Sequence, residues 1–174
     1  LGRLLASLHS ITAAQASVAG VETRSPEQVR QAWRDDIDKV RDGFSVSPAF
    51  VESWEAWLSD DTCWPEETVM THGEIYPAHV LMSPDGVITG VLDWTTARAD
   101  DPARDFAAQY GAAGQDMLEA ALDAYEEAGG PVYPGMAAQA RHLWDAAPIG
   151  HGLYALTTGD EQDMATAAAM LGGE

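Results

Sequence analysis

One short segment in the middle of the chain carries most of the side chains that could do chemistry. Glu74 lies in a turn after a predicted short strand, His79 comes five residues later, and Asp93 follows a predicted hairpin. The hairpin's turn, Ser-Pro-Asp-Gly at residues 83–86, is typical of a reversal between antiparallel strands. Because a hairpin brings its two ends together, we expect His79 and Asp93 to be neighbours, with Glu74 close to both.

These residue types fit phosphoryl transfer to an alcohol. A carboxylate can act as general base for a hydroxyl group, and a carboxylate with a second ligand can bind a divalent cation. The order also matches the protein-kinase pattern, in which a base, a metal ligand five residues later and an aspartate after the next hairpin follow one another. We therefore predict Glu74 as the base and His79 and Asp93 as metal ligands, all three catalytic.

The segment resembles the aminoglycoside phosphotransferase family and, within it, the macrolide phosphotransferases. The family has a His-Gly-Asp motif, then a Gly-His pair where many relatives have Asn, then an Ile-Asp-Trp motif. The corresponding residues here are His72-Gly73-Glu74, Ala78-His79 and Leu92-Asp93-Trp94. Other stretches that look like macrolide-kinase sequence lie at residues 33–38, 57–58, 64–65 and 100–107, so the resemblance runs from Leu1 to about Tyr125.

The resemblance implies an α+β, mainly helical fold, the C-terminal lobe of a protein-kinase-like enzyme, over residues 1–174. Its catalytic loop and small β-hairpin would occupy about 68–95. Structural support for this loop would come from His72 and from Asp105, which would bind the loop backbone. The cofactors would be Mg²⁺ and GTP or ATP, whose γ-phosphate would pass to the 2′-hydroxyl of a macrolide.

Two features depart from the family pattern. The family's catalytic Asp is Glu74 here, which is longer by one methylene group, and a displacement of about 1 Å can cost roughly a hundredfold in rate. The chain also has a single lysine, Lys39, and shows no glycine-rich loop of the kind that clamps nucleotide phosphates. We expect the N-terminal, nucleotide-clamping lobe to be absent and this lobe to be inactive without it.

The composition restricts the partners. Nine basic residues against 28 acidic ones give a net charge of −19, which would repel nucleic acid and attract a cationic small molecule. A macrolide fits because it joins a dimethylammonium sugar to a large apolar ring. The single cysteine, Cys63, gives no sign of an oxidising compartment, and no apolar run has the length of a membrane span. We therefore expect a cytoplasmic protein with no membrane partner.

Two other functions remain open. The chain could be a non-catalytic kinase-like module that binds a drug or a protein partner, as Glu74 and the expected absence of a nucleotide lobe suggest. It could also be a kinase of aminoglycosides or of another small alcohol such as choline or homoserine. Acid content alone does not separate these substrates, and the family resemblance favours macrolides.

The remaining pattern is mostly helical. We expect Asp105 to be a helix N-cap, and a helix to begin at Ser25-Pro26. Together these patterns predict a helical domain that carries one small β-hairpin. The expected helices cover residues 1–11, 26–44, 48–58, 105–129, 135–156 and 161–171, and the expected strands cover 68–71, 80–82 and 87–92.

Overall fold

The computed structural model describes residues 1–172, and these residues form two compact units. Unit 1 comprises Leu1–Glu27 and Thr62–Trp144, and unit 2 comprises Gln28–Asp61 and the chain from Asp145 onward. Unit 1 contains every residue that the sequence places in the candidate site. Within residues 1–172, none of the helices has both the length and the apolar character needed to cross a bilayer.

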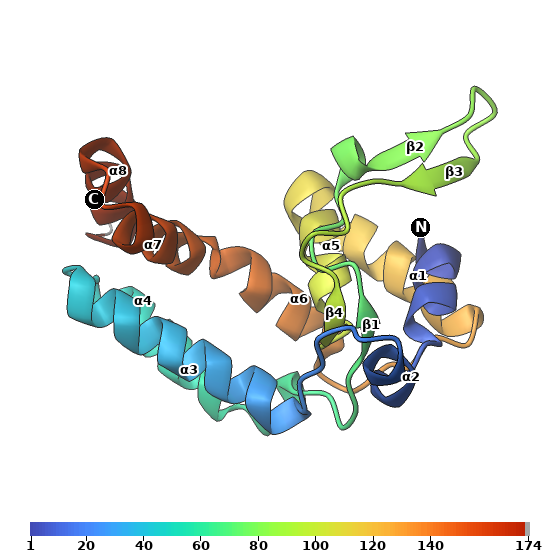
Figure 1. Ribbon diagram of the computed structural model, residues 1–174, viewed down its shortest axis with the longest axis horizontal. Coiled ribbons are helices and arrows are strands. Elements are labelled where there is room, and N and C mark those ends of the chain that lie inside the picture. Colours follow the sequence, from blue (N-terminus) through green and yellow to red (C-terminus); the bar gives the residue numbers. More distant parts are fainter. Residues whose placement is uncertain (173–174) are drawn as a thin grey trace. The chain divides into compact units, whose positions relative to one another are not determined.

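Unit 1 combines helices with two separate two-stranded antiparallel sheets (Figure 1). One sheet pairs β1 (Val69–Thr71) with β4 (Arg98–Asp100), and the other pairs β2 (Val80–Met82) with β3 (Ile88–Val91). A 3-10 turn, Pro77–His79, leads directly into β2. The helices are α1 (Gly2–His9), α2 (Ala13–Val18), α5 (Arg104–Glu127) and α6 (Met136–Asp145).

The core of unit 1 forms where α1 packs against α5. Leu5 and Ala6 on α1 face Leu118 and Tyr125 on α5, and all four are buried. The two helices approach closely at Gly2, where an added Cβ would come within 2.5 Å of the Ala121 carbonyl oxygen. This packing fixes the end of α1, which carries His9, beside the start of α5.

Unit 2 is made of four helices. α3 (Pro26–Gly43) begins with proline at its first position, as the sequence predicts. Its partners are α4 (Pro48–Ser59), α7 (Ala147–Thr158) and α8 (Glu161–Gly172). Trp33 and Trp57 meet edge to face, with ring centroids 5.1 Å apart, and Gly152 lies against Val40. Aromatic and aliphatic side chains at helical spacing therefore hold this unit together.

The structure confirms the α+β, mainly helical fold class and the β2–β3 hairpin. Gly86 donates from its backbone N–H to the Ser83 carbonyl at 2.9 Å and has a positive φ of 79°, which glycine adopts without strain. The expectation of a single hairpin is incomplete, because β1 and β4 form a second sheet and α2 was not foreseen.

Two expected helices differ in detail. The helix expected at 135–156 is wrong: the chain breaks at Ala146 into α6 and α7, because Pro148 has no N–H to continue a helix and sits in the first turn of α7. The expected N-cap role of Asp105 is also wrong. Ala103 precedes α5, and Asp105 lies inside its first turn. α5 itself has a kink at Ala113 and Gly114.

Candidate active site

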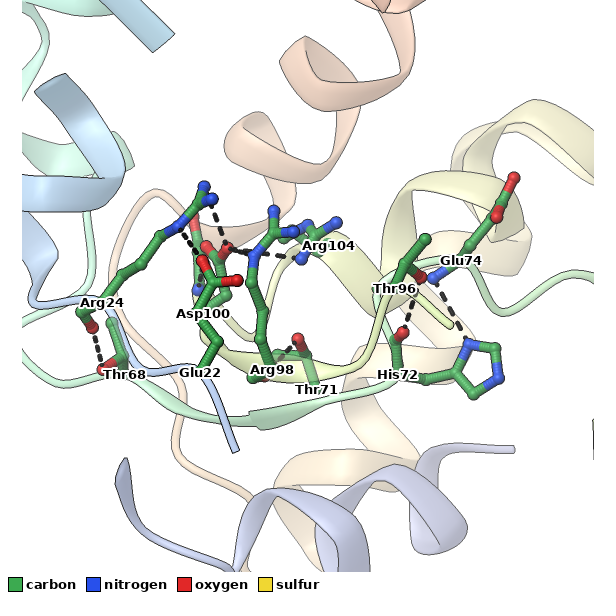
Figure 2. Close-up of polar contacts among 12 residues, drawn as sticks. Glu22, Arg24, Thr68, Thr71, His72, Glu74, Thr96, Arg98, Asp100 and Arg104 are labelled. Carbon is green, nitrogen blue, oxygen red and sulfur yellow. Dashed lines mark hydrogen bonds and ion pairs between the residues drawn. The ribbon is translucent and has the colours of Figure 1, made fainter. Parts of the chain in front are cut away.

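The loop of residues 72–79 follows β1 directly and has one position that only glycine fits. Gly73 has a φ of 89°, and a Cβ there would lie 2.9 Å from the Thr96 carbonyl oxygen. The Thr96 hydroxyl donates to the His72 carbonyl at 3.0 Å, so the segment after β3 lies against the loop (Figure 2). Close contact with Thr96, in the segment that follows the hairpin, therefore constrains the loop backbone.

Asp105 anchors this loop from α5. Its Oδ2 accepts a hydrogen bond from the His72 backbone N–H at 2.9 Å, and its Oδ1 accepts one from the Gly73 N–H at 2.6 Å. Both side-chain oxygens are thus engaged in a fully buried position. These are the backbone hydrogen bonds that the family resemblance implies for Asp105, although its contribution to catalysis stays a prediction.

Two residues that the sequence did not single out complete the anchor. His9 lies 3.0 Å from Asp105 through Nε2, and its Nδ1 lies 2.8 Å from the Tyr125 hydroxyl. The same Oδ2 accepts from the His72 backbone N–H, so it serves as an acceptor for His9 as well: Nε2 carries the donated hydrogen and Nδ1 accepts from Tyr125. Burial raises the pKa of Tyr125 above its ordinary value, so its hydroxyl remains a donor. The sequence signal was weak, because His9 belongs to no motif.

His72 joins the loop to the end of the hairpin. Its ring is fully buried, Nε2 donates to the Leu92 carbonyl at 2.9 Å, and Nδ1 accepts from the Glu74 backbone N–H at 3.3 Å. The ring also meets Trp94 edge to face, with centroids 4.8 Å apart. Both nitrogens of His72 are occupied by the protein, which suits a supporting residue better than a metal ligand.

His79 and Asp93 are neighbours, as the hairpin predicts. The His79 Nε2 and the Asp93 Oδ2 are 3.8 Å apart. Because the Glu74 carbonyl oxygen can only accept, His79 donates to it from Nδ1 at 2.8 Å, and this contact fixes the tautomer. The lone pair of Nε2 is then available on the side facing Asp93.

Asp93 has an unusual backbone and a stabilised charge. Its φ of 59° lies in the left-handed region, which few residues other than glycine adopt and which is common at functional sites. Oδ1 accepts hydrogen bonds from the Thr95 hydroxyl at 2.6 Å and the Thr95 N–H at 3.4 Å. These bonds, with smaller effects of His79 and His72, lower the pKa of Asp93. The carboxyl is therefore ionised at neutral pH.

The carboxylate of Glu74 is exposed and points away from the His72 ring (Figure 2). Within residues 1–172 this carboxylate makes no hydrogen bond or ion pair, and only the Glu74 backbone contacts His79 and His72. No three His, Cys, Asp or Glu side chains of the described chain are grouped to hold a metal ion. The structure therefore brings His79 and Asp93 together and leaves the Glu74 carboxylate open to solvent.

His79 and Asp93 could supply two ligands to a divalent cation whose remaining ligands are water or phosphate oxygens. Mg²⁺ commonly binds through one or two carboxylates and takes its other ligands from water and phosphates. A ligating histidine usually donates its second ring N–H to a carbonyl or carboxylate, as His79 does to Glu74. The imidazole nitrogen makes the pair less selective for Mg²⁺ than two oxygens would be.

We expect Mn²⁺, a paramagnetic substitute for Mg²⁺, to bind this pair in the isolated chain. In NMR titrations at neutral pH, the ring signals of His79 should broaden before those of the exposed His151, because Nε2 of His79 lies 3.8 Å from the Asp93 carboxylate. Asp93→Asn should abolish the selective effect. Equal broadening of His79 and His151 would show that the pair does not bind the ion.

Beside the anchor, Asp101 forms a second buried cluster. Its Oδ1 accepts from the Ala103 N–H at 2.9 Å and the Tyr133 hydroxyl at 2.8 Å, and its Oδ2 accepts from Gln139 Nε2 at 2.7 Å. Burial nevertheless raises the pKa of Asp101 to about 6, against an ordinary value of 3.8. The cluster joins the chain before α5 to α6.

This pKa predicts a specific pH dependence of stability. Because the folded-state pKa lies above the unfolded one, protonation favours the folded state, and the contribution of Asp101 is lost as pH rises through about 6. The measurement that tests this is the free energy of unfolding of the wild type and of Asp101→Asn between pH 4 and pH 7. The wild type should lose stability relative to the variant as pH rises. A constant difference, or one of opposite sign, would contradict this assignment.

A loop held by a buried aspartate and followed by a hairpin that ends in a second aspartate is the arrangement of protein-kinase-like phosphotransferases. Residues 1–138 match the family described as "APH: Phosphotransferase enzyme family". The chain belongs to this family.

Among solved structures, two macrolide phosphotransferases are very similar to the chain. The macrolide 2′-phosphotransferase MphH from Brachybacterium faecium, an apoenzyme, is 48% identical with a TM-score of 0.93, over 99% of this chain and 59% of that one. A macrolide 2′-phosphotransferase type I is 38% identical with a TM-score of 0.93, over 99% and 57%. These similarities confirm the resemblance to the macrolide branch.

Two further similar proteins are a Bacillus subtilis relative and a more distant aminoglycoside phosphotransferase. "Uncharacterized protein YcbJ" of Bacillus subtilis (strain 168) is 33% identical over 172 residues, which are 99% of this chain and 56% of the relative. A GDP complex of aminoglycoside 2′-phosphotransferase-IIIa has a TM-score of 0.72 at 14% identity, over 98% and 60%, and shows the shared fold. The chain thus spans between 56% and 60% of the length of these four proteins.

Proposed function

We propose that the chain is the acceptor-binding and catalytic lobe of a kinase that transfers the γ-phosphate of a nucleoside triphosphate to the 2′-hydroxyl of a macrolide. The observation that carries this proposal is the 48% identity and TM-score of 0.93 with a macrolide 2′-phosphotransferase over 99% of the chain. The geometry of the 72–79 loop supports it, because the free Glu74 carboxylate and the neighbouring side chains of His79 and Asp93 lie on one loop and its hairpin.

In the proposed mechanism, Glu74 orients the sugar hydroxyl and accepts its proton. Its carboxylate is free of protein partners within residues 1–172, so it can reach the acceptor. Asp93 and His79 would hold Mg²⁺, which supplies positive charge to neutralise the phosphates during transfer. Asp105 and His72 keep the loop in place by binding its backbone. In this role they position Glu74 and do not touch the substrate.

A macrolide fits this lobe better than the alternatives. The net charge of −19 favours a cationic sugar, and the identity to macrolide enzymes is 38% and 48%. Solved aminoglycoside enzymes, including one bound to kanamycin, are only 14–16% identical, and a choline kinase is 18% identical. Those lower similarities support the common fold and give no reason to assign an aminoglycoside or choline as substrate.

The phosphate donor would be GTP or ATP, held mainly by a lobe outside the 174 residues. The chain covers 59% of MphH, and we propose that the uncovered part of such relatives clamps the nucleotide. The GDP complex of an aminoglycoside 2′-phosphotransferase is in keeping with a nucleotide donor. The only lysine, Lys39, lies on α3 and is exposed, which does not suit a phosphate clamp.

A fusion of this chain to the part of MphH that it does not cover tests the proposal. We expect the fusion, with GTP or ATP and Mg²⁺, to add one phosphate to erythromycin, as measured by mass spectrometry. The 174 residues alone should not, and should bind the nucleotides weakly in calorimetry. A fusion that folds and binds both substrates without forming product would contradict the proposed activity.

One observation favours a second function, a binding module without catalysis. Glu74 stands where the family has aspartate, and its carboxylate contacts neither His79 nor Asp93 in the described chain. Such a module would bind erythromycin with unchanged affinity whether residue 74 is Glu or Gln, and would form no product with either. The same fusion and a Glu74→Gln variant therefore separate the two functions.

A further inference from the structure

Three arginines gather around one buried carboxylate in unit 1. Arg98 hydrogen bonds through Nε to the Oδ2 of Asp100, Arg104 Nη1 lies 3.3 Å from the same oxygen, and Arg24 Nη1 lies 3.9 Å from it. Figure 2 shows the three guanidinium groups around this carboxylate. The chain has only nine basic residues, so a third of them meet at this point.

Backbone pairing and chain position place the three arginines around Asp100. Arg98 and Asp100 are two residues apart on β4, and alternate residues of a strand point to the same face. Arg24 comes alongside because its N–H donates to the Ala99 carbonyl at 3.0 Å, while the Ala99 N–H donates to Glu22 at 2.9 Å. Arg104 follows β4 as the first residue of α5.

The cluster reaches the 72–79 loop. A Cβ added at Gly73 would lie 3.0 Å from Nη2 of Arg104, so this guanidinium group packs against the residue before Glu74. Arg98 is tied to the end of β1, because its carbonyl accepts from the Thr71 hydroxyl at 2.9 Å. The arginines therefore lie beside the candidate active site, on the segment that leads into α5.

Protein acceptors satisfy only a small part of these guanidinium groups. Each arginine carries several N–H donors in a rigid planar fork. Within residues 1–172 each guanidinium group makes one hydrogen bond: Arg24 to Glu22, and Arg98 and Arg104 to Asp100. The side chains are 31%, 22% and 15% exposed respectively, so the remaining donors can reach solvent.

Three positively charged guanidinium groups share the single negative charge of Asp100. The other oxygen of this carboxylate, Oδ1, accepts from the Asp101 N–H at 2.8 Å, which leaves Oδ2 to serve all three cations. Nearby Asp105 is bound to the loop backbone and to His9, and Glu22, which is 61% exposed, pairs with Arg24. Burial and the neighbouring Arg98 and Arg24 lower the pKa of Arg104, while Asp100 and Asp105 raise it.

We infer that Arg24, Arg98 and Arg104 form a binding site for a phosphate dianion beside the 72–79 loop. Guanidinium forks match the geometry of phosphate oxygens, and charge-assisted hydrogen bonds to them are roughly twice as strong as neutral ones. Because Asp100 and the backbone already hold the three side chains in place, little side-chain freedom is lost when the anion binds. The ligand is inorganic phosphate or the phosphate group of a monoester. This inference does not depend on the macrolide or the nucleotide.

The test uses the 174-residue chain and inorganic phosphate at about 0.15 M ionic strength, where screening weakens the repulsion from the acidic surface. Binding is followed by the NMR shifts of arginine Nε–H groups and by the rise in thermal midpoint, against sodium chloride of equal ionic strength. Arg98→Gln should weaken binding about tenfold or more, since a hydrogen bond to a charged group contributes roughly that much. Arg41→Gln, which removes an exposed arginine paired with Glu55 in unit 2, is the matched control and should change nothing.

Asp100→Asn gives the sharper result. It removes the competing carboxylate and keeps an oxygen for the Asp101 N–H, so phosphate should bind more tightly than to the wild type even if the variant is less stable. A purely structural cluster predicts no phosphate-specific shift in the wild type and equal behaviour of Arg98→Gln and Arg41→Gln. Either finding would overturn the inference. Methyl phosphate, compared with inorganic phosphate, distinguishes a monoester site from one that needs the free anion.

Discussion

Glu74→Gln is expected to lower the rate of phosphate transfer to erythromycin by about 10²–10⁴-fold in the fusion protein, the range that a general base contributes. Glutamine keeps the size of the side chain and loses the ability to accept the proton. Because Glu74 has no side-chain partner within residues 1–172, the substitution should leave the fold and the thermal midpoint unchanged. Turnover at saturating nucleotide is the measurement. An unchanged rate would show that another group serves as base.

Glu74→Asp should act in the opposite direction and raise the rate. Gly73 is fixed against Thr96, and Asp105 holds the loop backbone, so the loop keeps its shape when one methylene group is removed. The family's shorter carboxylate should then reach the hydroxyl at the hydrogen-bond distance of roughly 2.6–3.2 Å. A clear fall in rate would mean that the loop is adapted to glutamate.

Asp105→Ala should reduce the free energy of unfolding by about 3 kcal/mol or more, because it leaves three buried or partly buried N–H donors without an acceptor and each such donor costs roughly 1–3 kcal/mol. The substitution removes the acceptor for two backbone N–H groups of the 72–79 loop and leaves His9 buried without its carboxylate. Chemical denaturation followed by tryptophan fluorescence gives the value. The loop should also lose its order, so selective broadening of His79 by Mn²⁺ should disappear.

Two variants control this result. Asp123→Ala removes an exposed aspartate from the same helix and should change stability by no more than about 0.5 kcal/mol. Asp105→Asn retains one acceptor oxygen and should fall between that control and Asp105→Ala. If Asp105→Ala were as stable as the exposed control, the hydrogen bonds of Asp105 would not hold the 72–79 loop in place.

The sequence predicted the local parts of the site well. A turn sequence such as Ser-Pro-Asp-Gly specifies its own reversal, so the pairing of Val80 with Val91 could be expected, and the closeness of His79 to Asp93 followed from it. The helices that begin at Pro26 and Pro48 could be predicted for the same reason, because their start signals are local.

The parts that depend on distant contacts could not be predicted in this way. His9 binds Asp105 and Tyr125, which are 96 and 116 residues away in the sequence, and no local pattern specifies such a partner. β4 was missed because Arg98 and Asp100 are charged, and a strand of three residues is stabilised by pairing with β1 rather than by its own composition. The division of the expected 135–156 helix was missed because Pro148 lies within a continuous apolar pattern. The structure shows that the chain ends one helix before this proline and begins another.

The most direct test of the central claim is the position of the phosphate on erythromycin after reaction with the fusion protein. Two-dimensional ³¹P–¹H NMR of the purified product should show the phosphorus coupled to the proton at the 2′ carbon of the amino sugar, and Glu74→Gln should form about 10²–10⁴-fold less of it in the same time. Phosphate at another hydroxyl, or transfer to kanamycin but not to erythromycin, would contradict the proposal that this chain is the catalytic lobe of a macrolide 2′-phosphotransferase.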